Sequence, residues 1–254
     1  MEEFAKEIAE KSNYLNKDIL YLKNTTISEY DIKSAGFTVI KFKKLLPPEE
    51  IEQLEKADKQ TRNILIGKRI LKYPKISEEI INTLADIRKD FVVLNQIHDE
   101  DILSIKKDAI FLIKKLPTNL KLDIFEFRPK GKYTSYCYVN KKEFYYSSVT
   151  NTLDVKGISD ESRVSQEKYL LNDIKRIMAM AEKITPDQLF LILKQYRSKY
   201  LNRQLNKETY RNMDNGKFEV NGYFLDTISD DSLADVDISQ NYISYLVPLF
   251  KALI

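Results

Sequence analysis

Two aspartates, Asp31 and Asp108, are the residues of this chain best placed to carry out chemistry. Asp31 follows a β-prone run and opens a polar turn, and Asp108 ends the polar Lys106-Lys107-Asp108 between the apolar runs ILSI and AIFLI. A carboxylate at a strand end is held at a fixed point, and carboxylate oxygens are ligands that Mg²⁺ prefers. Two such carboxylates on adjacent strands can hold the metal ions of phosphoryl transfer. Asp31 also fits an ordinary turn or N-cap residue, and Asp108 a solvated hairpin turn.

Two lysines stand beside this candidate site. Lys106 and Lys107 directly precede Asp108, and their ammonium groups compete with divalent cations for the carboxylates. Two interpretations therefore stay open. In one, Asp31 and Asp108 bind Mg²⁺ and catalyse; in the other, Lys106 forms a salt bridge with Asp31 or Asp108 and replaces the metal.

The elements that position these residues follow from hydrophobic periodicity and cap signals. Asp101–Leu116 is a β-hairpin signature, and Ile27–Lys41 reads as a strand, a turn and then a short helix or second strand. Helices are predicted from Pro47, over Asp58–Leu71 and over Ser77–Asn95, the last capped by Ser77. Upstream, the pattern predicts a helix over Glu2–Leu15 and a strand over Ile19–Leu22.

The C-terminal third is mostly helical by the same criteria. Apolar residues at helical spacing predict helices over Ser165–Ile184, Pro186–Leu205 and Asn241–Ile254, and Gly216–Asp226 alternates as a hairpin around Asn221-Gly222. The fold class predicted is α+β, with an antiparallel sheet flanked by helices in residues 1–160 and a helical domain in residues 161–254.

Composition restricts the function classes. The 254 residues are 43% hydrophobic and carry a net charge of +3, so bulk charge does not argue for a nucleic-acid partner. A local patch argues for such a partner, because basic residues alternate with Phe and Tyr between residues 113 and 142. Basic and aromatic side chains can bind phosphates and stacked bases, but the same pattern also fits a solvated sheet face. One Cys and one His exclude an internal disulfide and a zinc site made from them. No apolar run spans a membrane, so we expect a cytoplasmic protein with no membrane partner.

Several segments resemble motifs of the family B DNA polymerases. The segment Asp31 to Ile40, DIKSAGFTVI, resembles motif A, D-x-x-S-L-Y-P-S-I-I. Lys59 to Gly67 resembles motif B, K-x-x-x-N-S-x-Y-G. Ser104 to Phe111 stands where motif C, Y-G-D-T-D-S-I-F, is expected. Asn140 to Tyr145 is similar to the K-K-R-Y segment, and Leu153 to Ile158 to the K-G-I-E stretch. All five occur in the family's order.

The resemblance implies a polymerase palm with short fingers helices at about residues 45–72 and a thumb-like C-terminal region. It further implies Mg²⁺ on Asp31 and Asp108, the catalytic pair, and nucleoside triphosphate contacts from Lys59, Arg62, Asn63 and Gly36. Nucleic acid, a DNA or RNA primer-template, would meet the lysines of the strands and turns: Lys106, Lys107, Lys132, Lys141, Lys142 and Lys156.

The chain departs from the family at several positions. Lys106 replaces the first motif C aspartate, Gly36 the tyrosine that contacts the sugar, and Ile64 and Ile66 the motif B serine and tyrosine. We find no segment in these 254 residues that resembles the exonuclease or N-terminal domains of the family. Two functions therefore remain open: template-dependent nucleotidyl transfer, and a catalytically inactive palm-derived protein that binds nucleic acid or acts as a scaffold. Abundant Lys, Ile, Asn and Tyr fit an AT-rich genome, either of a bacteriophage or of a low-GC bacterium. With the resemblance, we expect a phage-type chain that acts in the host cytoplasm, with another replication or phage protein as a further candidate partner.

Overall fold

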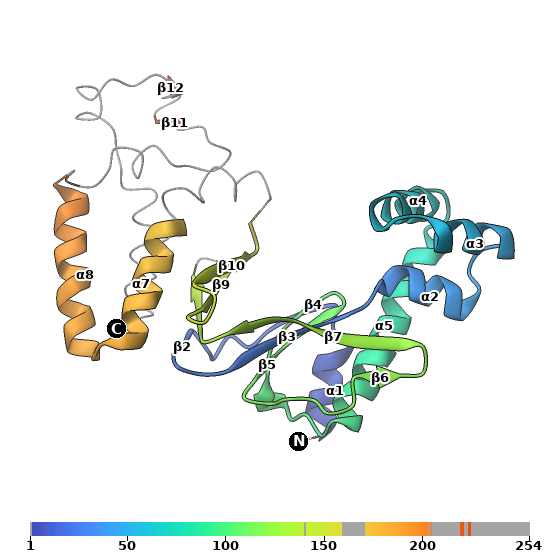
Figure 1. Ribbon diagram of the computed structural model, residues 1–254, viewed down its shortest axis with the longest axis horizontal. Helices are drawn as coiled ribbons and strands as arrows, with labels where there is room; N and C mark the ends of the chain where they lie inside the picture. Colours follow the sequence, from blue (N-terminus) through green and yellow to red (C-terminus); the bar gives the residue numbers. More distant parts are fainter. Residues whose placement is uncertain are drawn as a thin grey trace. The chain divides into compact units, whose positions relative to one another are not determined.

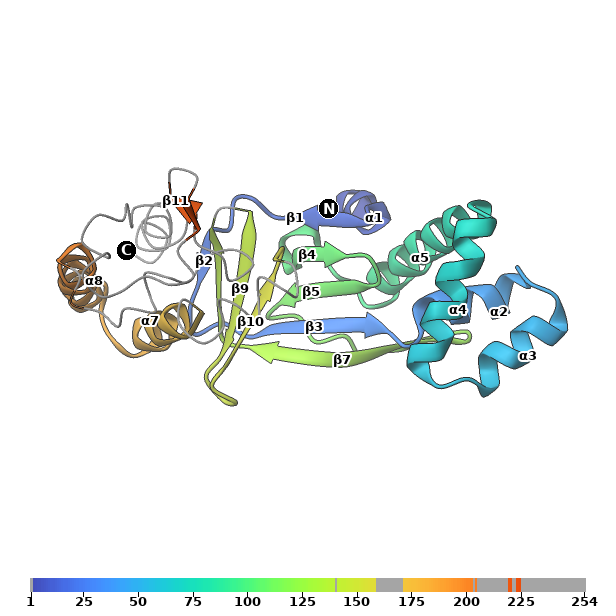
Figure 2. The same ribbon diagram turned by 90° about the horizontal axis from the view of Figure 1, so that it is seen from above.

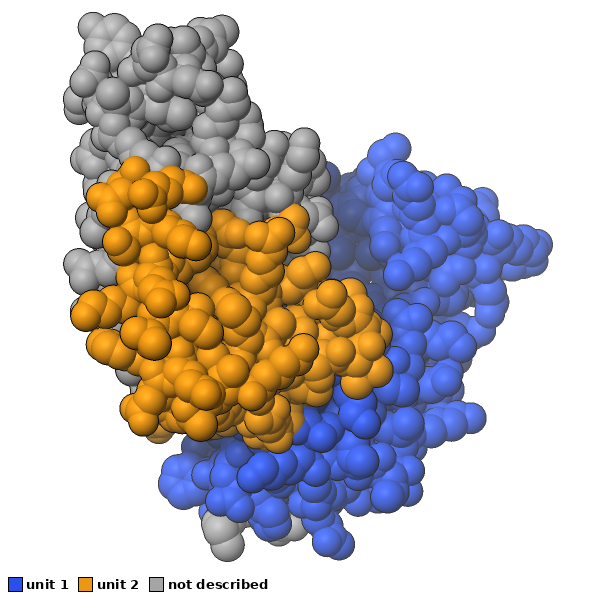
Figure 3. All heavy atoms as spheres, turned by 60° about the vertical axis from the view of Figure 1, so that its left-hand side comes forward, with its two compact units in different colours: residues 1–17, 26–132 blue, residues 18–25, 133–254 orange. Residues whose placement is uncertain are grey.

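The computed structural model describes residues 2–139, 141–158, 171–202, 204, 219–220 and 223–224. The chain divides into two compact units (Figure 3). Unit 1 comprises residues 1–17 and 26–132, and unit 2 comprises residues 18–25 and 133–254. The sequence placed a domain boundary at 160, whereas the contacts divide the chain at 132 and 133.

Unit 1 is built on a six-stranded sheet in the order β1-β4-β5-β3-β7-β6. Its strands are β1 (Asn13–Leu15), β3 (Ile27–Ile32), β4 (Ile102–Lys106), β5 (Ala109–Ile113), β6 (Lys121–Leu122) and β7 (Phe125–Tyr133). Strands β4 and β5 form the expected hairpin, with Lys106 opposite Ala109 across a turn made by Lys107 and Asp108. In Figure 2, β3 and β7 lie side by side and run in opposite directions.

Helices α1 (Glu2–Glu10) and α5 (Lys75–Leu94) cover one face of this sheet (Figure 1). Helices α2 (Ala35–Lys43), α3 (Pro48–Lys56) and α4 (Lys59–Lys72) follow beyond the end of β3, and a short 3₁₀ helix, η1 (Asp99–Asp101), leads into β4. Side chains of α1, α2 and α5 form one core cluster with the inward residues of the strands, including Tyr30 and Ile32 of β3. Because side chains alternate along a strand, Glu29 and Asp31 lie on the other face of β3.

A second cluster joins the helices beyond β3. Ile40 of α2, Leu54 of α3, Ile66 of α4 and Ile76 of α5 are buried together. This cluster fixes α4 against the start of α2 and the start of α5, so that one face of α4 is held beside the end of β3. Figure 2 shows β3 running directly into α2, with α3 and α4 next to it.

Unit 2 holds a four-stranded sheet in the order β10-β9-β8-β2. Its strands are β2 (Tyr21–Leu22), β8 (Ser135–Val139), β9 (Lys142–Ser147) and β10 (Thr152–Lys156), and its long helices are α7 (Asn172–Lys183) and α8 (Pro186–Leu201). Phe144, Tyr146 and Val155 of the sheet pack with Ile177 of α7 and Leu193 of α8. A two-residue pairing joins β11 (Glu219–Val220) to β12 (Tyr223–Phe224), as the alternation around Asn221-Gly222 predicts.

The α+β fold class is confirmed, with antiparallel sheets flanked by helices. Two local predictions are wrong. The first helix ends at Glu10, because Asn13–Leu15 pairs with β4 as a strand, and α5 begins at Lys75 after Pro74, so Ser77 is not its cap. The segment after Asp31 is a helix, which resolves the alternative left open. The expected helix Asn241–Ile254 lies outside the described residues. Among the described helices, none is both long and apolar enough for a membrane span.

Candidate functional site

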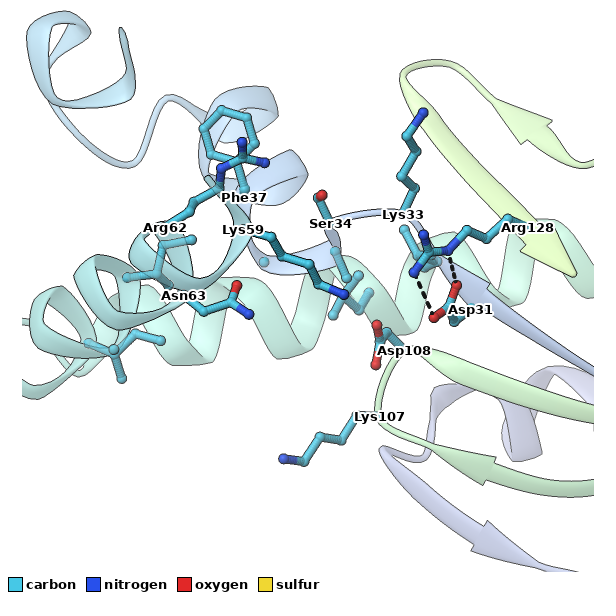
Figure 4. Close-up of a pocket in the computed structure, with 17 residues that line it drawn as sticks. Asp31, Lys33, Ser34, Phe37, Lys59, Arg62, Asn63, Lys107, Asp108 and Arg128 are labelled. Carbon is cyan, nitrogen blue, oxygen red and sulfur yellow. Dashed lines mark hydrogen bonds and ion pairs between the residues drawn. The ribbon is translucent and has the colours of Figure 1, made fainter. Parts of the chain in front are cut away.

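A pocket of about 560 Å³ in unit 1 gathers residues from β3, β7, α2, α4 and α5 and from the β4–β5 turn (Figure 4). The end of β3 and the start of α2 line one side, α4 a second, and the β4–β5 turn and β7 a third. The lining residues are Asp31–Phe37, Lys59, Arg62, Asn63, Ile66, Gly67, Ile70, Leu84, Lys107, Asp108 and Arg128. All six residues predicted for catalysis or nucleotide contact are among them.

Helix α4 presents one polar face to the pocket. Lys59, Asn63 and Gly67 are four residues apart, so they share a face of the helix. In Figure 4, Lys59 and Asn63 extend from α4 into the pocket, toward the end that holds Asp108. The start of the helix is fixed by Asp58, whose Oδ1 accepts hydrogen bonds from the backbone N–H groups of Gln60 (2.9 Å) and Thr61 (3.1 Å).

The N-terminus of α2 opens into the same pocket. Its N-cap, Ser34, has the left-handed φ of 51° and forms no side-chain cap hydrogen bond. The backbone N–H groups of the first turn carry the positive end of the helix dipole, which favours a bound anion. Gly36 lines the pocket, and an added Cβ there would meet only Ile80 Cδ1, at 3.9 Å, so the position is not crowded.

Asp31 is held in an ion pair. Arg128 donates from Nε to Oδ1 at 2.6 Å and from Nη2 to Oδ2 at 3.2 Å, and Lys130 Nζ lies 3.8 Å from Oδ2. In one of the two interpretations left open, Lys106 pairs with Asp31 or Asp108; the cation that pairs with Asp31 is instead Arg128 of β7. The sequence carried a signal for this: Glu29 and Asp31 alternate along β3 as Arg128 and Lys130 do along β7.

Asp108 has a different environment. Burial is the largest cause that raises the pKa of its carboxyl, a backbone hydrogen bond opposes it, and the nearby charge of Asp31 raises the pKa further against weaker effects of Lys130 and Lys107. Within the described part of the chain it forms no ion pair. The Ile32 N–H donates a hydrogen bond to the backbone oxygen of Asp108 at 3.3 Å, which ties the turn to the end of β3. The two carboxylates therefore belong to one site.

A buried arginine positions the turn that carries Asp108. Arg88 of α5 is 1% exposed, and its Nη1 donates to the Lys107 carbonyl at 2.6 Å. Its Nε donates to the Ala9 carbonyl at 2.9 Å and its Nη2 to the Lys11 carbonyl at 3.1 Å, so it also caps the end of α1. Burial lowers the pKa of Arg88 to about 10, which leaves the guanidinium charged at neutral pH. Sequence reasoning missed this residue, since its helical spacing marks it only as part of α5.

Arg62 has a structural role in this pocket. Its Nε donates to the Leu54 carbonyl and its Nη2 to the Ala57 carbonyl, both at 2.8 Å, and its guanidinium lies 4.7 Å from the centre of the Phe37 ring. These contacts hold α3, α4 and the start of α2 together. Its predicted contact with a nucleotide has no support from this geometry, whereas the ammonium of Lys59 and the amide of Asn63 point into the pocket.

The lysines predicted to meet nucleic acid are divided between the units. Lys106, Lys107 and Lys132 belong to unit 1, and Lys141, Lys142 and Lys156 to unit 2. Of these six, Lys107 lines the pocket. Lys156 pairs with Asp154 at 2.7 Å.

Two of the segments that resemble polymerase motifs meet in unit 2. Residues 142–147 form β9 and residues 152–156 form β10, and the two strands pair. Gly157 has φ +88°, and an added Cβ would lie 2.8 Å from the Lys141 carbonyl oxygen. The glycine is therefore needed for the chain to leave β10 against the Lys141 backbone.

The family comparison matches nearly the whole chain. A family model described as "Bacteriophage PBS1 gene 130 protein" matches residues 4–254. The chain belongs to this family. Membership of the PBS1 gene 130 family agrees with the phage origin that the sequence predicts, and its description names a gene and no activity. None of the curated proteins matches the chain.

Proposed function

We propose that this chain is a palm-type nucleotidyltransferase of phage DNA replication, which binds a nucleoside triphosphate in the unit 1 pocket and transfers the nucleotide to a primer end. One observation carries the proposal. Three segments far apart in the sequence, around Asp31, Lys59 and Asp108, line one pocket. The resemblance to family B polymerases rests on short segments, and the three segments that resemble motifs A, B and C all contribute residues to this pocket, which supports the proposal.

The charge of the pocket supports a phosphate ligand. Among its lining residues, five are cationic and two are anionic, the aspartates. The N-terminus of α2 adds partial positive charge from backbone N–H groups. A triphosphate bound between α2 and α4 would lie next to these groups and next to the amine of Lys59.

The donor set fits Mg²⁺ that arrives with a triphosphate. Within the described residues no group of three or more His, Cys, Asp and Glu side chains is placed to hold a metal ion. Mg²⁺ needs no such cage, because it is commonly bound by one or two carboxylates together with substrate phosphates. Asp31 and Asp108 supply two carboxylates, close enough for the charge of one to raise the pKa of the other. Bound Mg²⁺ would lower the barrier by stabilising charge on the attacking and leaving oxygens.

The chain's own residues then have separate tasks. Asp31 and Asp108 hold the cation, the α2 N-terminus and Lys59 bind and orient the phosphates, and Asn63 offers an amide to the nucleotide. Arg88 fixes the turn on which Asp108 sits. Positioning of this kind supplies much of the rate enhancement in phosphoryl transfer.

Primer extension tests the proposal. The wild-type chain is incubated with Mg²⁺, a labelled primer on a DNA or RNA template, and the four nucleoside triphosphates. We expect extension that Asp31→Asn and Asp108→Asn each reduce at least a hundredfold, with circular dichroism spectra unchanged. An Asp31→Asn variant as active as the wild type would refute the assignment of the carboxylates.

A metal-free nucleic-acid-binding protein is the second candidate. The ion pair of Asp31 with Arg128 favours it, since this guanidinium already satisfies both carboxylate oxygens. That function predicts salt-sensitive binding of nucleic acid without Mg²⁺ and no nucleotide incorporation. The same extension reaction, run beside a binding titration, separates the two candidates.

A further inference from the structure

Strands β3 and β7 carry a ladder of three ion pairs. Lys33 Nζ lies 3.2 Å from Glu126 Oε2, Arg128 Nε 2.6 Å from Asp31 Oδ1, and Lys130 Nζ 3.3 Å from Glu29 Oε1. In each ion pair the two residue numbers add up to the same value, as they do for residues that lie opposite each other on antiparallel strands. Lys130 is nearer to Glu29 than to Asp31, so Arg128 is the main partner of the site carboxylate.

The two partners in the central pair differ in exposure. The side chain of Asp31 is 9% exposed, whereas that of Arg128 is 44% exposed. Arg128 also lines the pocket. The guanidinium can therefore leave the carboxylate and stay over the pocket, while Asp31, buried in the sheet, stays where it is.

Arg128 and a divalent cation need the same oxygens. The fork of a guanidinium covers both oxygens of a carboxylate, and both oxygens of Asp31 are covered here. A buried carboxylate with no partner is strongly destabilising, and the only other cation that pairs with Asp31 among the described residues is Lys130, whose Nζ lies 3.8 Å from Oδ2 and closer to Glu29. Asp31 therefore needs either Arg128 or a bound cation as its main partner.

We propose that Arg128 is the exchangeable counter-ion of Asp31. A divalent cation that arrives with a triphosphate displaces the guanidinium, and the released guanidinium binds a phosphate oxygen in the pocket. This inference rests on the proposed function, because it concerns the same pocket. It assigns to Arg128 two opposite effects: it weakens binding of the cation alone, and it strengthens binding of the triphosphate once the cation is present.

Manganese binding tests the first effect without any catalytic readout. Mn²⁺ is titrated into the full chain without nucleotide, and free Mn²⁺ is measured by its electron paramagnetic resonance signal. Arg128→Gln is expected to tighten Mn²⁺ binding at least tenfold. Lys33→Gln is the matched control, because it removes one positive charge from the same pocket without touching Asp31; we expect a change below threefold.

ATP binding at saturating Mn²⁺ tests the second effect. Arg128→Gln is expected to weaken ATP binding at least fivefold. The ATP affinity of Arg128→Lys should lie between those of Arg128→Gln and the wild type, since a lysine keeps the charge and loses the forked geometry. Thermal unfolding provides a further readout: Mn²⁺ should raise the Tm of Arg128→Gln more than that of the wild type. The double variant Asp31→Asn/Arg128→Gln should fold and lose this response.

The outcomes separate the two proposals. If Mn²⁺ and ATP bind to the wild type and Arg128→Gln changes neither affinity, or if Lys33→Gln tightens Mn²⁺ as much, the exchange is refuted and the proposed function stands. If neither the wild type nor Arg128→Gln binds Mn²⁺ or ATP, both proposals fail together.

Discussion

The two aspartates of the pocket are stabilised in different ways, although they lie on neighbouring elements. Asp31 faces a guanidinium that satisfies both of its oxygens. Asp108 stands in a turn, half-buried, and its pKa is raised chiefly by that burial and further by the charge of Asp31. In the absence of a cation ligand, the fold therefore tolerates the charge of Asp31 well and that of Asp108 poorly.

This difference predicts the pH dependence of an Asp108→Asn variant. The folded-state pKa of Asp108 lies above its usual value of 3.8, so the wild type is most stable, relative to the variant, below the unfolded pKa and loses that advantage as pH rises through the folded pKa. We expect Asp108→Asn to have the higher Tm at pH 7 in metal-free buffer, and the gain to shrink at pH 3. Calorimetry at pH 3 and pH 7 measures the difference in Tm between the variant and the wild type. A lower Tm for Asp108→Asn than for the wild type at pH 7 would contradict burial as the cause of the raised pKa.

Arg88 is the residue whose loss should cost the most stability. Replacement by Met leaves the carbonyls of Ala9, Lys11 and Lys107 without their donor. We expect Arg88→Met to lower the free energy of unfolding by about 3 kcal/mol in urea denaturation. The free energy of unfolding of Arg88→Lys, which keeps the charge and loses the forked guanidinium, should lie between those of Arg88→Met and the wild type. A loss below about 0.5 kcal/mol would show that the turn is held by other contacts.

Gly36 predicts weak discrimination between sugars. In the family that the chain resembles, a tyrosine stands at this position of motif A and refuses a 2′-hydroxyl by steric clash, and a clash disappears with the side chain. Phe37 does not substitute for it, because its ring lies against the Arg62 guanidinium. We expect the wild type to incorporate ribonucleotides nearly as well as deoxyribonucleotides, and Gly36→Tyr to restore selectivity. Competition of both nucleotides in one extension reaction decides; strong rejection of ribonucleotides by the wild type would contradict the motif A alignment.

Among the elements, α4 offers the cleanest comparison of two faces. Lys59 lines the pocket and Lys68, on the same helix, does not. We expect Lys59→Gln to weaken binding of a fluorescent triphosphate at least fivefold in the presence of Mg²⁺, and Lys68→Gln to change it less than twofold. Equal effects of the two substitutions would mean that the helix attracts the triphosphate only through its overall charge.

Local signals predicted the elements that depend on near neighbours. The β4–β5 hairpin and helices α3 and α4 follow from short apolar runs, Pro47-Pro48 and the Asp58 cap. Strand β1 was missed, because residues 13–15 become a strand only by pairing with β4, about ninety positions away. The partner of Asp31 was missed for the same reason: Arg128 is 97 residues distant along the chain.

At the scale of the whole molecule, the site is an assembly of segments separated by long stretches of chain. The sequence named six residues for catalysis or nucleotide contact, and all six line the pocket, as does Lys107, which was predicted to meet nucleic acid. It could not supply Arg88 and Arg128 as site residues, since neither belongs to a motif and each acts through contacts made only in the fold.

The central claim is that a nucleoside triphosphate binds in this pocket, and affinity labelling tests it most directly. ATP oxidised to its 2′,3′-dialdehyde reacts with nearby lysines, and borohydride reduction followed by peptide mapping identifies them. Three lysines line the pocket: Lys33, Lys59 and Lys107. The account predicts that label concentrates on these lysines, is displaced by excess ATP with Mg²⁺, and falls in Asp108→Asn. Labelling spread over other lysines such as Lys194, with no protection by ATP, would contradict it.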